Sequence, residues 1–160
     1  MKNVLLFIVV LCAFGCKTNI EKTNTKTPKT EHTKMETTEP KVIAKGNLYG
    51  SGEEGIIKQN LIVTNQADWD TLIAQLDSVN KVSAGFTVTT IDFSKEIVIA
   101  VFDEVKGSGG HRLELAISQN SDNTLVEVTR IAPKGMATSV MTQPYYIVKI
   151  ANNTLPIVFK

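Results

Sequence analysis

The chain has 160 residues, and its 17 lysine and arginine residues nearly balance its 16 acidic residues, giving a formal net charge of +1. So small a charge does not favour a nucleic-acid partner, because binding to a phosphate backbone relies on clustered basic residues. The two cysteines, Cys12 and Cys16, both lie near the N-terminus. The rest of the chain is therefore predicted to hold no disulfide and no thiolate metal site.

The first residues resemble the signal peptide of a bacterial lipoprotein. Lys2 provides a positive charge, residues 4–14 form an apolar run, and Ala13-Phe14-Gly15 leads directly to Cys16. The run is too short to span a bilayer as a helix. We expect residues 1–15 to be removed and Cys16 to carry lipid, which anchors the domain to a bacterial membrane, facing the periplasm or the cell surface. The alternative is an ordinary cleaved signal peptide, with Cys16 lost or left free.

Residues 16–40 are dominated by threonine, lysine and glutamate and contain no aromatic side chain. Ile20 and Met35 are the clearly apolar residues of this segment. Such a segment buries too little apolar surface to offset the entropy lost on ordering. We expect a disordered tether.

Residues 41–160 are predicted to form one β-rich domain with a single core. Its first two predicted strands are Val42–Tyr49 and Ile56–Thr64. Glycine-rich residues 50–55 lie between these strands, and we expect them to close a hairpin.

The clearest helix of the chain follows these strands. Asn65 is a good N-cap, and Asp68 is placed where its carboxylate can reach back toward the cap. Helical spacing then gives an apolar stripe of Trp69, Leu72, Ile73 and Leu76. We expect Trp69 to be the core anchor of this helix.

The most apolar stretch of the domain is Ile97–Phe102, an uninterrupted run that is typical of a strand covered on both faces. The next predicted strand, His111–Ile117, alternates instead, with Leu113, Leu115 and Ile117 on one side. We expect the two strands to form a central hairpin around the turn at residues 103–110.

Four further short strands are predicted at Phe86–Thr90, Leu125–Ile131, Tyr145–Ile150 and Ile157–Phe159. Pro144 stands at the start of one of them, where a missing N–H is tolerated. The pattern predicts a mainly β fold: an antiparallel β-sandwich or partly open barrel, with one α-helix near the start of the domain.

The order of these motifs resembles the PrcB C-terminal domain family. The resemblance runs from the Trp69 helix almost to the C-terminus, through Ile91-Asp92-Phe93, Ser108-Gly109-Gly110-His111, Pro133 and Thr142-Gln143-Pro144-Tyr145. In the family the turn commonly reads Thr-Gly-Gly-Tyr, so serine keeps the hydroxyl here while histidine removes a large aromatic surface. The resemblance implies a non-catalytic subunit that binds and stabilises another protein, such as the subtilisin-like protease of a cell-surface complex.

Two segments are predicted to contact a partner protein, because rigid β scaffolds often carry recognition residues in turns at one end. They consist of Gly107, Ser108, Gly109, Gly110, His111, Gln143, Pro144 and Tyr145. The alternative is that Pro144 and Tyr145 protect an edge strand and fill the rim of the core. The glycine turn is not predicted to bind phosphate, since no Gly-Lys-Ser/Thr follows and no helix begins there.

The sequence offers few residues for catalysis or for metal binding. A hydrolase using Ser108 and His111, with Asp103 or Glu104 orienting the histidine, is conceivable, but residues three apart around a turn rarely reach attack geometry. His111 is the only histidine after residue 40, and Glu53-Glu54 is expected to be a solvated turn rather than a Ca²⁺ site. The sequence thus predicts no enzyme, no metal and no other cofactor. An inhibitor-like module that occupies a protease cleft is an alternative to the accessory protein.

Overall fold

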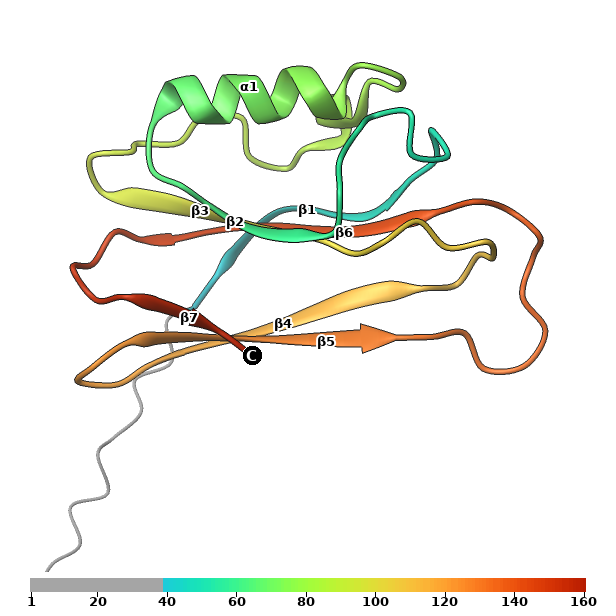
Figure 1. The fold of residues 1–160 in the computed structure, drawn as a ribbon. Helices are drawn as coiled ribbons and strands as arrows, with labels where there is room; N and C mark the ends of the chain where they lie inside the picture. Colours follow the sequence, from blue (N-terminus) through green and yellow to red (C-terminus); the bar gives the residue numbers. More distant parts are fainter. Residues whose placement is uncertain (1–38) are drawn as a thin grey trace, which may run out of the picture. The chain divides into compact units, whose positions relative to one another are not determined.

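The computed structural model describes residues 39–160, which form two β-sheets and one α-helix (Figure 1). The fold is mainly β, and its two separate sheets make a sandwich without a closed barrel, which confirms the predicted fold class. The predicted signal peptide, Cys16 and residues 16–38 of the tether lie outside the described residues and stay predictions. Within residues 39–160, no helix has both the length and the apolar character needed to cross a membrane.

The first sheet contains four antiparallel strands in the order β1, β6, β3, β2. Their bounds are β1 Lys41–Leu48, β2 Gln59–Val63, β3 Glu96–Phe102 and β6 Gln143–Ala151. The second sheet has the order β4, β5, β7, with β5 and β7 parallel; its strands are β4 Arg112–Gln119, β5 Thr124–Ile131 and β7 Ile157–Phe159.

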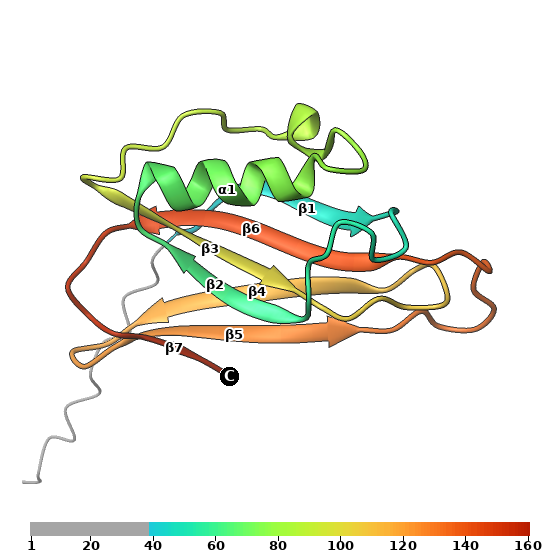
Figure 2. The same ribbon diagram turned by 45° about the horizontal axis from the view of Figure 1, so that its top comes forward.

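Helix α1 (Gln66–Leu76) covers the outer face of the first sheet, as both views show (Figures 1 and 2), and the 3-10 helix η1 (Val82–Gly85) follows it. The N-cap prediction is confirmed: the Asp68 backbone N–H donates to Asn65 Oδ1 at 2.9 Å, and Asn65 Nδ2 donates to Asp68 Oδ2 at 2.7 Å. Trp69 is buried, as predicted, and its ring centroid lies 6.1 Å from that of Phe86.

Strand β3 is buried on both faces because it lies between the helix and the second sheet. Alternate residues Val98, Ala100 and Phe102 belong to the helix-side core, and Ile97, Ile99 and Val101 belong to the core between the sheets. This position explains the uninterrupted apolar run, as predicted. The neighbouring strand β6 is also buried on both faces.

Two predicted hairpins are wrong. Strands β1 and β2 do not pair, since they form opposite edges of the first sheet, and residues 56–58 precede β2. Strands β3 and β4 belong to different sheets, so residues 103–111 cross from one sheet to the other. The reason is packing: strands that are apolar on both faces take the sheet interior, while the alternating strand β4 buries one face and exposes the other.

The strand predicted at Phe86–Thr90 is also absent from the fold. This segment is irregular and runs along the edge of β1, where the Thr87 backbone N–H donates to the Ile43 carbonyl at 2.9 Å. The Thr87 hydroxyl donates to the Val42 carbonyl at 2.8 Å. The segment therefore covers a sheet edge without extending the sheet.

Candidate functional site

Three loops meet at one end of the sandwich, which we call the loop end: residues 49–58, 103–111 and 132–142 (Figure 1, right). Strand register places them together, because Leu48 lies opposite Gln143 and Phe102 lies opposite Tyr145 in the first sheet. In the second sheet, Arg112 at the start of β4 lies opposite Ile131 at the end of β5.

The glycine turn at residues 107–110 is fixed against the third of these loops. Lys106 and Thr142 exchange two backbone hydrogen bonds of 2.7 and 2.9 Å, and the Gly109 N–H donates to the Thr138 carbonyl at 2.9 Å. The Thr142 hydroxyl donates to the Ser108 carbonyl at 3.0 Å. The turn and Thr142, the first residue of the predicted segment Thr142–Tyr145, thus lie together at this end of the sandwich.

The predicted contact residues differ in accessibility. Gly107 and Gly110 are exposed, Ser108 and His111 are half-buried, and Gly109 is buried. The other predicted contact residues are all buried in β6: Gln143, Pro144 and Tyr145. A partner at the surface would therefore meet the turn, and not the side chains of these three β6 residues.

The β6 residues hold the loop end together. Gln143 Nε2 donates to the backbone carbonyls of Ile56 and Asp103, at 2.8 and 2.9 Å, which joins two of the loops. Tyr145 stacks on Phe102 with ring centroids 6.4 Å apart, and burial raises the pKa of its phenol. Because β6 is an interior strand, Pro144 does not protect a sheet edge, whereas Tyr145 does fill the core.

Glu54 is not solvated, although the sequence predicted an acidic surface turn. Its side chain is buried, and Oε1 accepts a hydrogen bond from the Gly50 backbone N–H at 2.9 Å. A Cβ atom at Gly50 would collide with this carboxylate. Glu54 therefore closes the first loop from inside. Within residues 39–160, no group of three or more His, Cys, Asp or Glu side chains is arranged to hold a metal ion.

Ser108 and His111 are closer than we expected from their spacing. Ser108 Oγ and His111 Nε2 lie 3.1 Å apart, within hydrogen-bonding distance, although residues three apart around a turn were expected to reach attack geometry only rarely. A catalytic histidine is normally oriented by a third group. Asp103 and Glu104 do not serve this purpose, because they bind basic side chains instead.

Asp103 is the centre of a charged cluster that the sequence did not reveal. Its buried carboxylate binds Lys58 Nζ at 3.4 Å, Lys106 Nζ at 3.4 Å and Arg130 Nε at 3.3 Å. Burial raises the pKa of Asp103, but the Glu104 backbone N–H and the Lys106 charge outweigh burial and hold this pKa below the usual aspartate value. The sequence signal that could have indicated this cluster is the position of Asp103, a carboxylate directly after the buried strand β3.

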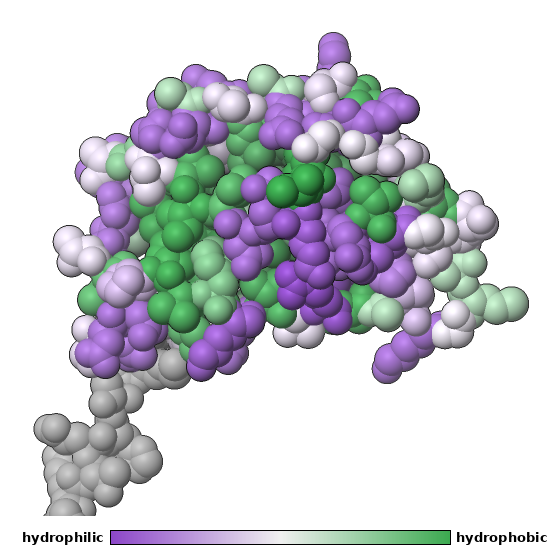
Figure 3. Space-filling view, viewed as in Figure 1, coloured by the Kyte–Doolittle hydropathy of each residue, from purple (hydrophilic) through white to green (hydrophobic). Residues whose placement is uncertain are grey.

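Exposed apolar side chains gather at the loop end. Five of the eight large apolar side chains that are exposed within residues 39–160 belong to its loops: Tyr49, Ile57, Met136, Val140 and Met141. Figure 3 shows green and pale green side chains reaching the surface at this end. Sequence reasoning missed them because isolated apolar residues in polar loops show no periodicity.

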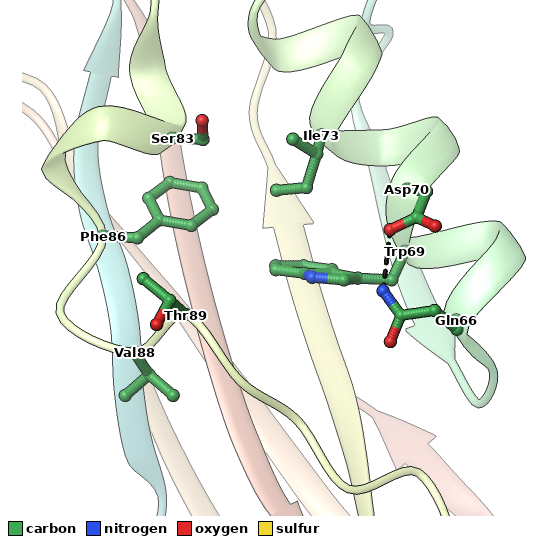
Figure 4. Close-up of a pocket in the computed structure, with 8 residues that line it drawn as sticks. All are labelled: Gln66, Trp69, Asp70, Ile73, Ser83, Phe86, Val88 and Thr89. Atoms are coloured by element: carbon green, nitrogen blue, oxygen red, sulfur yellow. Dashed lines mark hydrogen bonds between the residues drawn. The ribbon is translucent and has the colours of Figure 1, made fainter.

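A separate groove of about 250 Å³ lies between α1 and the segment around η1 (Figure 4). Its walls include Trp69, Ile73 and Phe86, and Gln66 Nε2 donates to Asp70 Oδ1 at 2.7 Å on the helix side. The aromatic pair of Trp69 and Phe86 spans it, so this groove is a shallow opening in the helix-side core.

Comparisons with protein-family models, with curated proteins and with solved structures found no match for this chain.

Proposed function

We propose that this chain is a lipid-anchored, non-catalytic accessory protein of the bacterial cell envelope, which binds and stabilises another envelope protein such as a protease. The gathering of exposed apolar side chains at the loop end carries the proposal. Exposed apolar side chains that gather in one region of a surface commonly mark a protein contact site. The resemblance to the PrcB C-terminal domain family supports the same role.

The direction of β1 is compatible with a membrane anchor at one end of the sandwich and a partner at the loop end. Strand β1 begins at Lys41, opposite Lys149, and reaches the loop end at Leu48, opposite Gln143. A strand of this length spans about 25 Å. The chain thus enters the sandwich at the end away from the loop end, and an anchor at Cys16 would leave the loop end free to meet a partner.

The test is a pull-down of the full-length lipidated protein from crosslinked, detergent-solubilised envelopes. The double variant Met136→Asp/Met141→Asp should lose the partner, because it places two charges in the apolar contact. Val158→Asp should keep the partner, since Val158 is an exposed apolar residue of β7, outside the loop end. Recovery of no partner by the parent protein, or equal recovery by both variants, would count against the proposal.

The inhibitor-like module uses the same surface and differs in its effect on a bound protease. If the recovered partner is a protease, excess accessory protein should leave its cleavage rate unchanged or raise it. A rate that falls with added protein, and is restored by Met136→Asp/Met141→Asp, would identify an inhibitor instead.

A hydrolase is the second candidate, and the hydrogen bond between Ser108 and His111 is the observation in its favour. A serine nucleophile with a histidine base would cleave an activated ester such as p-nitrophenyl acetate. Loss of such turnover in His111→Ala, with an unchanged melting temperature, would establish this function and replace the accessory role.

A further inference from the structure

The charged cluster around Asp103 brings two exposed cations close together. Lys58 Nζ and Arg130 Nε both bind the same carboxylate oxygen, Oδ1, at 3.4 and 3.3 Å, and Lys106 Nζ binds the other oxygen at 3.4 Å. Lys58 precedes β2 of the first sheet, and Arg130 belongs to β5 of the second. The cluster therefore lies where the two sheets meet at the loop end.

The buried carboxylate is rigidly placed. The Asp103 backbone N–H donates to the Pro144 carbonyl at 2.9 Å, and Gln143 Nε2 donates to the Asp103 carbonyl at the same distance. Both partners belong to β6, which is an interior strand. Asp103 thus sets the positions of Lys58 and Arg130 before any ligand arrives, which lowers the entropic cost of binding.

The charges of the cluster do not balance. Asp103 binds three basic side chains, whereas Glu104 binds Lys106 at 2.6 Å and also attracts Lys58, so the described cluster holds three cations and two carboxylates. The Lys58 and Arg130 side chains are 46% and 40% exposed, and Arg130 contacts Asp103 through Nε, which leaves its terminal nitrogens available. Two neighbouring cations on one carboxylate repel each other, and a second carboxylate between them would relieve that repulsion.

An apolar contact lies beside these cations. Ile57 directly precedes Lys58 and is 71% exposed. In Figure 3, hydrophilic side chains gather near the centre of the face that carries β2 and β5, with apolar side chains beside them. A ligand that matches this surface presents carboxylates next to aliphatic side chains, and guanidinium and carboxylate groups suit each other in bidentate geometry.

We infer that the loop end recognises an acidic, aliphatic-containing peptide segment of its partner protein, with Lys58 and Arg130 binding a carboxylate and Ile57 providing the apolar contact. This inference rests on the proposed function and names the chemistry of the partner. The charge complementarity between the two cations and the acidic peptide is local, because the chain as a whole carries a net charge of only +1.

The experiment measures fluorescence anisotropy of a rhodamine-labelled peptide of alternating glutamate and leucine, titrated with the full-length protein in neutral detergent. The peptide should bind, and replacing its glutamates by glutamine should weaken binding at least tenfold. Lys58→Gln and Arg130→Gln should each weaken binding about tenfold, and added salt should weaken it further. Lys134→Gln, a charge change in another loop at the same end, should have no effect.

Equal binding of the glutamine peptide, or unchanged affinity in both cluster variants, would overturn the inference. Binding to phosphatidylglycerol vesicles that depends on Lys58 and Arg130, without binding to the peptide, would also overturn it and assign the cluster to a membrane surface. Melting temperatures of the variants show whether lost binding reflects unfolding. Lys58→Arg keeps the positive charge that Lys58→Gln removes, so it should bind the peptide as the parent protein does. If Lys58→Gln still recovers the envelope partner while Met136→Asp/Met141→Asp does not, the inference fails and the proposed function stands.

Discussion

Asp103 lies directly after β3 of the first sheet, and the Arg130 that binds it belongs to β5 of the second. A buried carboxylate loses its hydration, so its charge is stable only where ion pairs and hydrogen bonds replace the water. Here Lys106 and the Glu104 backbone N–H supply that replacement. Asp103 therefore joins the two sheets at the loop end while it positions the exposed cations.

Asp103→Asn is expected to lower the free energy of unfolding by about 2 kcal/mol at neutral pH, because it leaves three basic side chains around a neutral amide. Urea unfolding at pH 7 measures this loss. Asp122→Asn provides the control, since Asp122 is exposed in the turn between β4 and β5 and should change stability little. Equal stability of Asp103→Asn and the parent would contradict the role of the cluster.

The contribution of Asp103 also predicts a pH dependence. Its folded-state pKa is lowered, so the ionised carboxylate stabilises the fold fully above the unfolded-state pKa, near 4. This stabilisation is lost as the pH falls through the lower folded-state pKa. The stability difference between the parent and Asp103→Asn should therefore narrow below about pH 4, and a gap that stays constant to pH 2 would contradict this assignment.

Gly110 gives a backbone prediction for the turn. Its φ is +81°, and a Cβ atom there would lie 2.9 Å from Pro133 Cβ. Gly110→Ala should cost about 1–2 kcal/mol in the free energy of unfolding, measured with urea. Gly107→Ala is the matched control, because a Cβ there meets nothing within 4 Å. Similar stability of the two variants would show that the turn tolerates a different backbone conformation.

At the scale of elements, local patterns predicted α1 and β3 well. The cap at Asn65 and the apolar spacing of the helix are properties of neighbouring residues, as is the continuous apolar run of β3. Strand pairing was predicted wrongly because it depends on residues far apart in the chain. Strand β6, from the C-terminal part of the sequence, lies between β1 and β3. The residues of the predicted hairpin turn, 50–55, contain no local signal of this long-range pairing.

In the candidate site, too, some features could be predicted from the sequence, whereas contacts between distant segments could not. The sequence predicted that the glycine turn and the segment Thr142–Tyr145 lie at one end of the sandwich, and the Lys106–Thr142 bridge joins them there. It did not predict that Gln143, Pro144 and Tyr145 are buried, since that follows from the interior position of β6, which is covered on both faces. The charged cluster was missed because Lys58, Asp103 and Arg130 come from three distant segments.

Trp69→Ala tests how far the helix depends on its core anchor. Trp69 is buried and packs with Phe86, so its removal should cost about 3–5 kcal/mol in the free energy of unfolding. Chemical denaturation measures this loss, and Tyr49→Ala is the control because Tyr49 is an exposed aromatic residue. A Trp69→Ala variant that unfolds at the parent's urea concentration would contradict the packing described for α1.

At the scale of the whole molecule, the two sheets are tied at both ends. Asp103 and Arg130 connect them at the loop end. At the other end, Asn153 follows β6 and its Nδ2 donates to Thr124 Oγ1 of β5 at 3.1 Å. A sandwich fixed at both ends holds its loops in constant relative positions, which suits a surface that must match a partner.

Site-specific photo-crosslinking in living cells tests the central claim most directly. A photoreactive amino acid at position 136, in the loop end, should crosslink to an envelope protein, whereas the same amino acid at position 158, in β7, should give no crosslink to it. Crosslinks from position 158 but none from position 136 would place the contact surface elsewhere and contradict the account.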